Sequence, residues 1–328
     1  MARLTGRYVL RRLLISCVTI YALATLLFGL LHAMPGSPID SLVGPSMTSE
    51  QIQRLEGQFG LNEPLWQQYV DFIRNYLVFD FGTSVSTLEP VNERILERLF
   101  PTLILFVPAF ILQYSIGTIL GTYFGWKRGS KVELGGFVAG LTLYSIPFFW
   151  LGWILIGVFA YELNVLPSGQ MLPPYVNEFT WFEAVTKLVL HLTLPVLSLA
   201  LIGWAGPMLI MRTTMQDVVD ADYIDFARAQ GYPESTVMTK FGARNALIPV
   251  VTQAIIGIAF MIDGSVIVET VFSWPGIGEL LVDAVFEKDL PTALAAFYTL
   301  GVLIVVLRFV TDIVYTYIDP RIEFGGTD

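Results

Sequence analysis

Long apolar stretches dominate this 328-residue chain and constrain its fold more than any other feature. An α-helix needs about 20 consecutive apolar residues to cross the roughly 30 Å hydrocarbon core of a bilayer, and each stretch is long enough. Only 14% of the residues are charged, whereas soluble domains carry about 25%. We therefore predict an all-α polytopic membrane protein with about six transmembrane helices, over residues 13–34, 102–126, 134–161, 188–211, 246–272 and 293–317.

The first apolar stretch is expected to be retained as a membrane span rather than cleaved as a signal peptide. It follows a basic start with Arg3, Arg7, Arg11 and Arg12, which a signal peptide would share. However, the apolar run is longer than that of a signal peptide, and no small-residue cleavage site follows it.

The placement of basic residues predicts which segments face the cytoplasm, because short cytoplasmic loops are enriched in Lys and Arg. Basic residues gather at the N-terminus, after the second stretch (Lys127 and Arg128), after the fourth (Lys240 and Arg244) and at Arg321. Six spans place all of these regions on one side. We therefore expect both termini to be cytoplasmic, in a multi-pass protein of the cell membrane.

This topology predicts three parts. Residues 1–34 form the cytoplasmic N-terminus and first transmembrane helix, residues 35–100 an exported helical cap, and residues 101–328 a five-helix core with a cytoplasmic loop at 213–245. In the cap, the run from Thr48 to Gln51 resembles a capping box, and Pro64 suits the first turn of another helix.

The cytoplasmic loop contains residues typical of a helix end and a helix start, which predict two helices joined by a tight turn. An amphipathic helix ends at Gln230, Gly231 suits a left-handed helix end, and Pro233 suits the first turn of a helix over residues 234–246. Composition alone allows two interpretations: a compact knob that contacts a partner, or a hairpin that only joins two spans.

The same loop carries a resemblance to a known family. The run Asp222-Tyr-Ile-Asp-Phe-Ala-Arg-Ala-Gln-Gly231, followed by Arg244-Asn-Ala-Leu-Ile-Pro249, resembles the coupling motif of ABC importer permeases, and more narrowly the dipeptide, oligopeptide and nickel permease family. Further matching strings occur along essentially the whole chain: Arg11-Arg-Leu-Leu14, Met34-Pro-Gly-Ser-Pro38, Asp80-Phe-Gly-Thr-Ser84, Ser145-Ile-Pro-Phe-Phe-Trp150, Leu166-Pro-Ser-Gly169, Glu269-Thr-Val-Phe-Ser-Trp-Pro-Gly-Ile-Gly278, Asp312-Ile-Val-Tyr315 and Asp319-Pro-Arg321. Gln230 and Phe241-Gly242 depart from the usual family residues.

The resemblance implies a type I ABC importer permease fold and a role as one half of a translocation pathway, with di- or oligopeptides as substrate. Nickel complexes and oligosaccharides are alternatives within the family. Implied partners are a second, paralogous permease subunit, two cytoplasmic ATPase subunits, an extracytoplasmic solute-binding protein and membrane lipid. The residues it assigns to ATPase coupling are Asp222, Tyr223, Ala227, Arg228, Ala229, Gly231, Arg244 and Asn245.

Two of these residues are arginines, and we expect Arg228 and Arg244 to pair with acidic groups of the ATPase or with lipid phosphates. The alanines Ala227 and Ala229 would let the backbones of the two proteins approach closely.

Few other residues point to chemistry. Asp263 lies in the fifth stretch, where a charge is costly, so it either lines the substrate pathway or contacts another helix; as an ion site it would suit a secondary transporter.

The two histidines, His32 and His191, and the single Cys17 predict no metal site. The sequence has no Gly-x-Ser-x-Gly, His-Glu-x-x-His or Walker motif, so we expect no enzyme activity and no cofactor. A net charge of −9 argues against a nucleic-acid partner.

Overall fold

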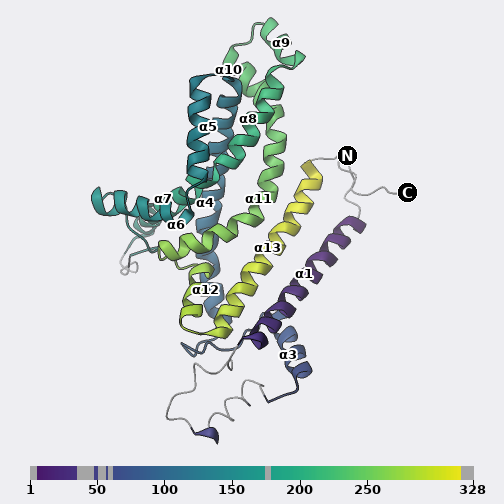
Figure 1. Ribbon diagram of the computed structural model, residues 1–328, viewed down its shortest axis with the longest axis vertical. Helices are drawn as coiled ribbons and strands as arrows, with labels where there is room; N and C mark the ends of the chain where they lie inside the picture. Colours follow the sequence, from purple (N-terminus) through teal and green to yellow (C-terminus); the bar gives the residue numbers. More distant parts are fainter. Residues whose placement is uncertain (1–5, 35–47, 51–56, 58–61, 174–178, 319–328) are drawn as a thin grey trace. The chain divides into compact units, whose positions relative to one another are not determined.

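The computed structural model describes residues 6–34, 48–50, 57, 62–173 and 179–318. The chain divides into two compact units, a terminal unit of residues 1–102 and 275–328 and a central unit of residues 103–274. Helices form nearly all of the regular structure (Figure 1), and the described residues contain no β-strand beyond an isolated bridge between Thr83 and Pro90. This all-α architecture confirms the predicted fold class.

Five helices are long and apolar enough to cross a membrane, and a bent pair of helices makes a sixth candidate span. The prediction of about six spans is therefore confirmed, and the protein is a multi-pass membrane protein. The candidate spans lie in α1 (Gly6–Ala33), α4 (Val91–Trp126), α7 (Trp181–Gly203), the segment Glu234–Ile258 that leads into α11 (Arg244–Val271), and α13 (Leu290–Ile318).

The third predicted span is not one straight helix, so the expectation of a continuous helix over 134–161 is wrong. It consists of α5 (Lys131–Tyr144), then α6 (Phe148–Leu155) with the π-helix η1 (Ile156–Glu162), and the two parts meet at 101°. The break falls at Pro147, which is extended with ψ 139° and precedes the first residue of α6. Proline has no N–H to donate and disfavours helix at the residue before it, so the chain turns here.

Other prolines leave their helices unbroken. Pro195 lies inside α7 and Pro249 inside α11. The fourth predicted span is divided instead at Trp204, where α7 gives way to α8 (Ala205–Val219).

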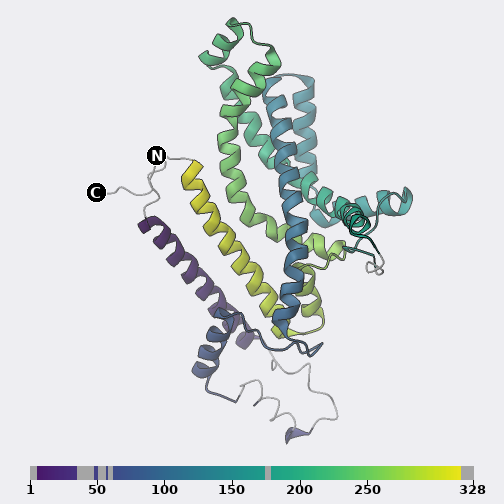
Figure 2. The ribbon, with the colours of Figure 1, turned by 180° about the vertical axis from the view of Figure 1, so that it is seen from behind.

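In the terminal unit, α1 packs beside α13, and α3 (Leu65–Leu77) packs on α1 (Figure 2). Aromatic rings join these helices: Phe28 of α1 meets Tyr69 and Phe72 of α3, and Tyr76 meets Tyr298 of α13. The predicted helix after Pro64 is confirmed, with Pro64 as its cap residue. The helix that would follow the predicted capping box at Thr48 to Gln51 lies largely outside the described residues.

A buried carboxylate joins the loop before α4 to the start of α13. Asp289, whose side chain is 0% exposed, accepts hydrogen bonds from Ser84 Oγ at 2.5 Å, Thr292 Oγ1 at 2.6 Å and the Val85 N–H at 3.0 Å. Arg94 of α4 lies 3.3 Å from the same carboxylate. Burial alone would raise the pKa of Asp289, but the hydrogen bonds from Ser84, Thr292 and Val85 outweigh it and hold the pKa below its ordinary 3.8.

Replacing Asp289 tests this network. Asp289→Asn removes the charge facing Arg94, and breaking a buried pair in this way costs about 3–5 kcal/mol. The pKa of Asp289 is lower in the folded protein than in the unfolded chain. The ionised carboxylate therefore stabilises the fold at pH values above the unfolded-state pKa, and this stabilisation is lost as the pH falls through the folded-state pKa. We expect Asp289→Asn to lower the melting temperature of the purified protein at neutral pH, and the difference from wild type to shrink below about pH 4.

Asp283→Asn, at an exposed carboxylate on the neighbouring helix α12 (Ile277–Phe286), is the control. Equal melting temperatures for wild type and Asp289→Asn at neutral pH would contradict the proposed stabilisation.

Candidate functional site

The predicted two-helix loop forms a hairpin, residues 222–243, at one end of the central unit (Figure 1). It comprises α9 (Asp222–Ala229), a turn, the short α10 (Glu234–Thr236) and the π-helix η3 (Val237–Ala243), which runs directly into α11. The chain enters the hairpin from α8 with a short break at Asp220 and Ala221. One end of the hairpin thus runs into α11, and the other end follows α8 after a two-residue break.

The hairpin turn depends on Gly231. Its φ is +80°, a conformation that side chains with a Cβ rarely adopt, and its N–H donates to the Arg228 carbonyl at 2.9 Å. The predicted helix end is therefore confirmed. A Cβ at Gly231 would meet no atom within 4 Å, so a substitution here strains the backbone without a steric clash. Pro233 is the cap residue before α10 rather than a residue of its first turn.

The two helical segments of the hairpin pack on each other through a small apolar core. Ile224 and Ala227 of α9 are 0% and 2% exposed and pack on Val237 of η3. Trp126, the last residue of α4, and Phe241 contact this core. Ala227 therefore has a packing role inside the hairpin.

Arg228 is also used inside the hairpin. Its guanidinium lies 3.1 Å from Asp225 and 3.2 Å from Glu234, and it stacks over the Trp126 ring at 5.3 Å. The hydrogen bond to Glu234, aided by the one to Asp225, raises the pKa of Arg228 above its usual value. These contacts join the two helices across the turn.

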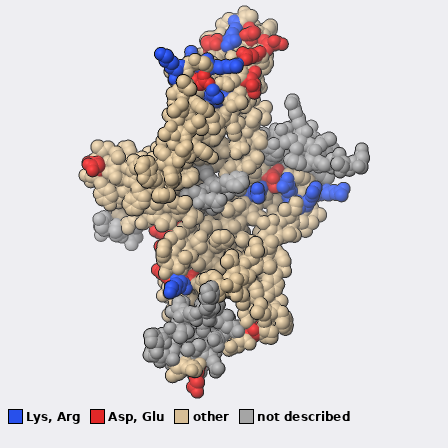
Figure 3. Space-filling view, viewed as in Figure 1, with Lys and Arg blue, Asp and Glu red and all other residues tan. Residues whose placement is uncertain are grey.

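The opposite face of the hairpin is exposed and aromatic. Phe226 is 65% exposed, Tyr223 40% and Tyr232 43%. The remaining predicted coupling residues, Asp222, Ala229, Arg244 and Asn245, are exposed too. Figure 3 shows that charged side chains gather over this end. Exposed clusters of large apolar side chains mark contact sites for other molecules.

The helix that leads into the hairpin, α8, runs beside α4 (Figures 1 and 2) and packs closely on it. Three glycines four residues apart, Gly117, Gly121 and Gly125, line the contact. A Cβ at these positions would lie 2.5–2.7 Å from the carbonyl oxygens of Trp204, Met208 and Arg212. Only glycine allows the two backbones to come this close.

A buried carboxylate that was not predicted from the sequence joins α8 to α5. Glu133, in the first turn of α5, is 7% exposed and accepts hydrogen bonds from Arg212 Nε at 2.8 Å, Gln216 Nε2 at 3.0 Å and the Gly129 N–H at 2.5 Å. The Glu133 N–H donates to Ser130 Oγ at 3.1 Å. The Ser130-x-x-Glu133 spacing is a helix-start signature, so the local half of this arrangement was detectable in the sequence.

The other predicted residues add no further site. Asp263 lies within α11, but its side chain is outside the described part of the structure. His32 contacts Gln68 and the Phe28 carbonyl, and His191 Nδ1 donates to the carbonyls of Gly169 and Gln170. Among the described residues, no cluster of three or more potential metal ligands occurs.

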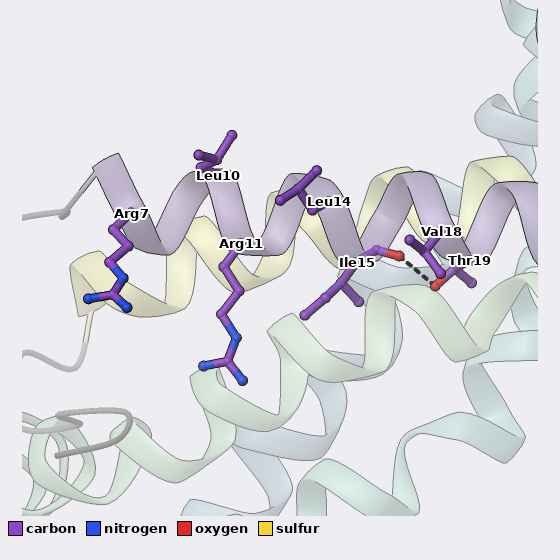
Figure 4. Close-up of a pocket in the computed structure, with 7 residues that line it drawn as sticks. All are labelled: Arg7, Leu10, Arg11, Leu14, Ile15, Val18 and Thr19. Carbon is purple, nitrogen blue, oxygen red and sulfur yellow. Dashed lines mark hydrogen bonds between the residues drawn. The ribbon is translucent and has the colours of Figure 1, made fainter. Parts of the chain in front are cut away.

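A hollow of about 460 Å³ lies along one face of α1 (Figure 4). Its apolar lining consists of Leu10, Leu14, Ile15 and Val18, and Arg7, Arg11 and Thr19 complete it. The Thr19 hydroxyl donates to the Ile15 carbonyl at 2.8 Å. The lining holds no carboxylate, imidazole or thiol, and so offers no acid, base or strong nucleophile.

Residues 117–324 match the family model described as the inner membrane component of binding-protein-dependent transport systems. The chain belongs to this family. Residues 5–106 match the N-terminal model of the same component. The protein is therefore a transport permease subunit of the ABC importer class, and its hairpin falls inside the matched region.

Similar curated proteins extend over the whole chain. The oligopeptide transport system permease AppB of Bacillus subtilis is 36% identical, over 97% of this chain and 99% of its own. The dipeptide transport system permease DppB of Alkalihalophilus pseudofirmus is 31% identical, over 97% and 99%. The glutathione transport system permease GsiC of Salmonella typhimurium is 34% identical, with the same coverage.

Proposed function

We propose that this permease forms one half of the translocation pathway of an ATP-driven importer for di- or oligopeptides. The observation that carries the proposal is the hairpin, which lies between α8 and α11 and leaves Tyr223 and Phe226 exposed. The substrate class rests on the names of the three relatives given above, which are permeases of oligopeptide, dipeptide and glutathione transport systems.

The energy for import comes from other subunits in this proposal. The sequence has no Walker loop, so two ATPase subunits outside the membrane would bind and hydrolyse ATP. A second, paralogous permease subunit would supply the other half of the pathway, because access to a central site alternates when two halves rock against each other. A solute-binding protein on the exported side would deliver the peptide.

Uptake by the reconstituted importer tests the function directly. We expect proteoliposomes containing this chain, its paralogue and the ATPases to take up a labelled oligopeptide only when ATP and the solute-binding protein are both supplied. A labelled nickel complex and an oligosaccharide serve as competing substrates. Peptide uptake without ATP, driven by an ion gradient, would contradict the proposal and favour a secondary transporter.

The proposed orientation puts the hairpin and both termini in the cytoplasm of the cell. The support is the Lys and Arg residues at the N-terminus, in the α4–α5 turn and in and beside the hairpin, because such residues mark cytoplasmic loops. The cap segment, residues 35–100, is then exported.

Cysteine labelling tests the orientation. In a Cys17→Ser background, a membrane-impermeant thiol reagent should label Asn62→Cys or Ser49→Cys from outside the intact cell, because both lie in the exported segment. Ser235→Cys, an exposed position in the hairpin, should be labelled only after the membrane is opened. The reverse pattern would contradict the six-span topology.

We also propose that the hairpin is the contact through which ATP-driven closure of the ATPase moves the permease. Asp222, Tyr223, Ala229, Arg244 and Asn245 would lie at the contact, and Gly231 would set its shape. Ala227 and Arg228 would act from inside, since they hold the two hairpin helices together.

Gly231→Val tests this role. A β-branched side chain at φ +80° costs about 1–3 kcal/mol, which is small for the folded membrane protein but enough to shift a fitted contact. We expect nearly normal amounts of the variant in the membrane, reduced co-purification of the ATPase and reduced peptide uptake.

Two variants control for side effects. Gly231→Asn adds a side chain that tolerates positive φ, and should retain most uptake. Ser235→Val places the same bulk at an exposed neighbour. Wild-type uptake by Gly231→Val with stoichiometric ATPase bound would rule out the hairpin as the coupling contact.

A further inference from the structure

Transmission of movement requires a firm link between the hairpin and the membrane helices, and the structure has one next to the hairpin. Glu133 on α5, Arg212 and Gln216 on α8, and the Gly129 N–H in the α4–α5 turn all meet at one carboxylate. Arg212 and Gln216 are one helical turn apart, so they contact Glu133 from the same face of α8. A single side chain of α5 thus joins α8 to the α4–α5 turn.

The ion pair is partly shielded from water. The side chains of Glu133 and Arg212 are 7% and 24% exposed. The Arg212 guanidinium also covers the Phe137 ring of α5 at 4.9 Å from the ring centre. An ion pair in such surroundings is directional and costly to break, because separation leaves a poorly solvated charge.

The backbone of α8 is also held against α4 at the same level. A Cβ on Gly125 of α4 would lie 2.7 Å from the Arg212 carbonyl oxygen. Arg212 therefore has α4 against its backbone and α5 against its side chain. Seven residues further along, α8 ends at Val219, and the hairpin begins at Asp222.

Apolar helix contacts can slide, whereas this arrangement resists sliding. A shift of α8 by one residue moves a side chain by about 1.5 Å along the helix axis, enough to break the hydrogen bonds from Arg212 and Gln216 to Glu133. A push or a pull on the hairpin would then move the α4–α5 turn together with α8.

We propose that Glu133 and Arg212 form a positioning pair that transmits hairpin movement to α4 and α5, so that ATP hydrolysis and peptide import remain coupled. This inference rests on the proposed function of the hairpin. The hairpin would bind the ATPase with or without the pair, and only the transfer of movement would depend on it.

A double variant separates transmission from simple stabilisation. In Glu133→Gln with Arg212→Met, the new amide oxygen can still accept a hydrogen bond from the Gly129 N–H, which Oε2 of Glu133 accepts in the wild type. Its NH2 group replaces the oxygen that faces Gln216 and can donate to the oxygen of that side chain once the Gln216 amide turns over. The methionine can still cover Phe137. Neither charge remains unpaired, and removing both members of a buried ion pair often leaves stability unchanged. A stabilising role alone thus predicts normal transport.

The measurement is peptide imported per ATP hydrolysed by the reconstituted importer, together with ATPase co-purification and melting temperature. We expect the double variant to retain bound ATPase and to hydrolyse ATP, while peptide imported per ATP falls about tenfold. Asp220→Asn, which removes an exposed ion pair of 3.2 Å with Arg128 in the same region, should retain the wild-type ratio. A wild-type ratio in the double variant would overturn the proposal.

Arg212→Lys decides the outcome if the double variant does not assemble. Lysine keeps the charge but lacks the planar fork that engages the carboxylate, so we expect an assembled protein with a lowered ratio; an unchanged ratio would overturn the proposal. Failure of the proposed function would look different, because wild type itself would then show no ATP-dependent uptake, or Gly231→Val would leave ATPase binding and uptake intact.

Discussion

The need to satisfy every backbone hydrogen bond without water governs this structure. Within lipid, a helix does this internally, and all candidate spans are helical. The bend at Pro147 interrupts a helix, and the backbone groups beside it find other hydrogen-bond partners. The Ser145 hydroxyl and N–H both donate to the Leu141 carbonyl, and the Trp150 and Leu151 N–H groups donate to the Pro147 carbonyl. The break thus leaves these groups paired, so a bend of 101° can persist in an apolar segment.

Two buried carboxylates follow a common plan at helix starts. Asp289 precedes α13 and accepts from the Thr292 N–H, while Glu133 lies in the first turn of α5 and accepts from the Gly129 N–H. The positive end of a helix dipole favours an anion at both places. Each carboxylate also contacts an arginine of another helix, Arg94 or Arg212. In each case, one carboxylate accepts a backbone hydrogen bond at the start of its helix and also holds a second helix against it.

The sequence predicted what local signals encode. Apolar length predicted the spans, and Gly231 predicted the hairpin turn, because positive φ is a property of one residue. Prolines were ambiguous: Pro147 breaks a span while Pro195 and Pro249 lie inside unbroken helices. The partners of Asp289 and Glu133 were not predictable in this way. Ser84 is 205 residues from Asp289, and Arg212 is 79 residues from Glu133. Only folding brings these pairs together.

The proposed mechanism divides two tasks between two kinds of interaction. A contact that must form and release is better made from exposed aromatic surface than from buried charge, since desolvating charges is costly, and Tyr223 and Phe226 provide that surface. The charges of Arg228, Asp225 and Glu234 are paired within the hairpin. Transmission of hairpin movement to the membrane helices needs the opposite property, a contact that stays formed under load. The ion pair of Glu133 and Arg212 provides such a contact at the start of α5. The other end of α5, Tyr144, lies at the 101° bend. Movement of α5 would therefore act on the one place where this span is already broken, and its angle can change there without disrupting a regular helix.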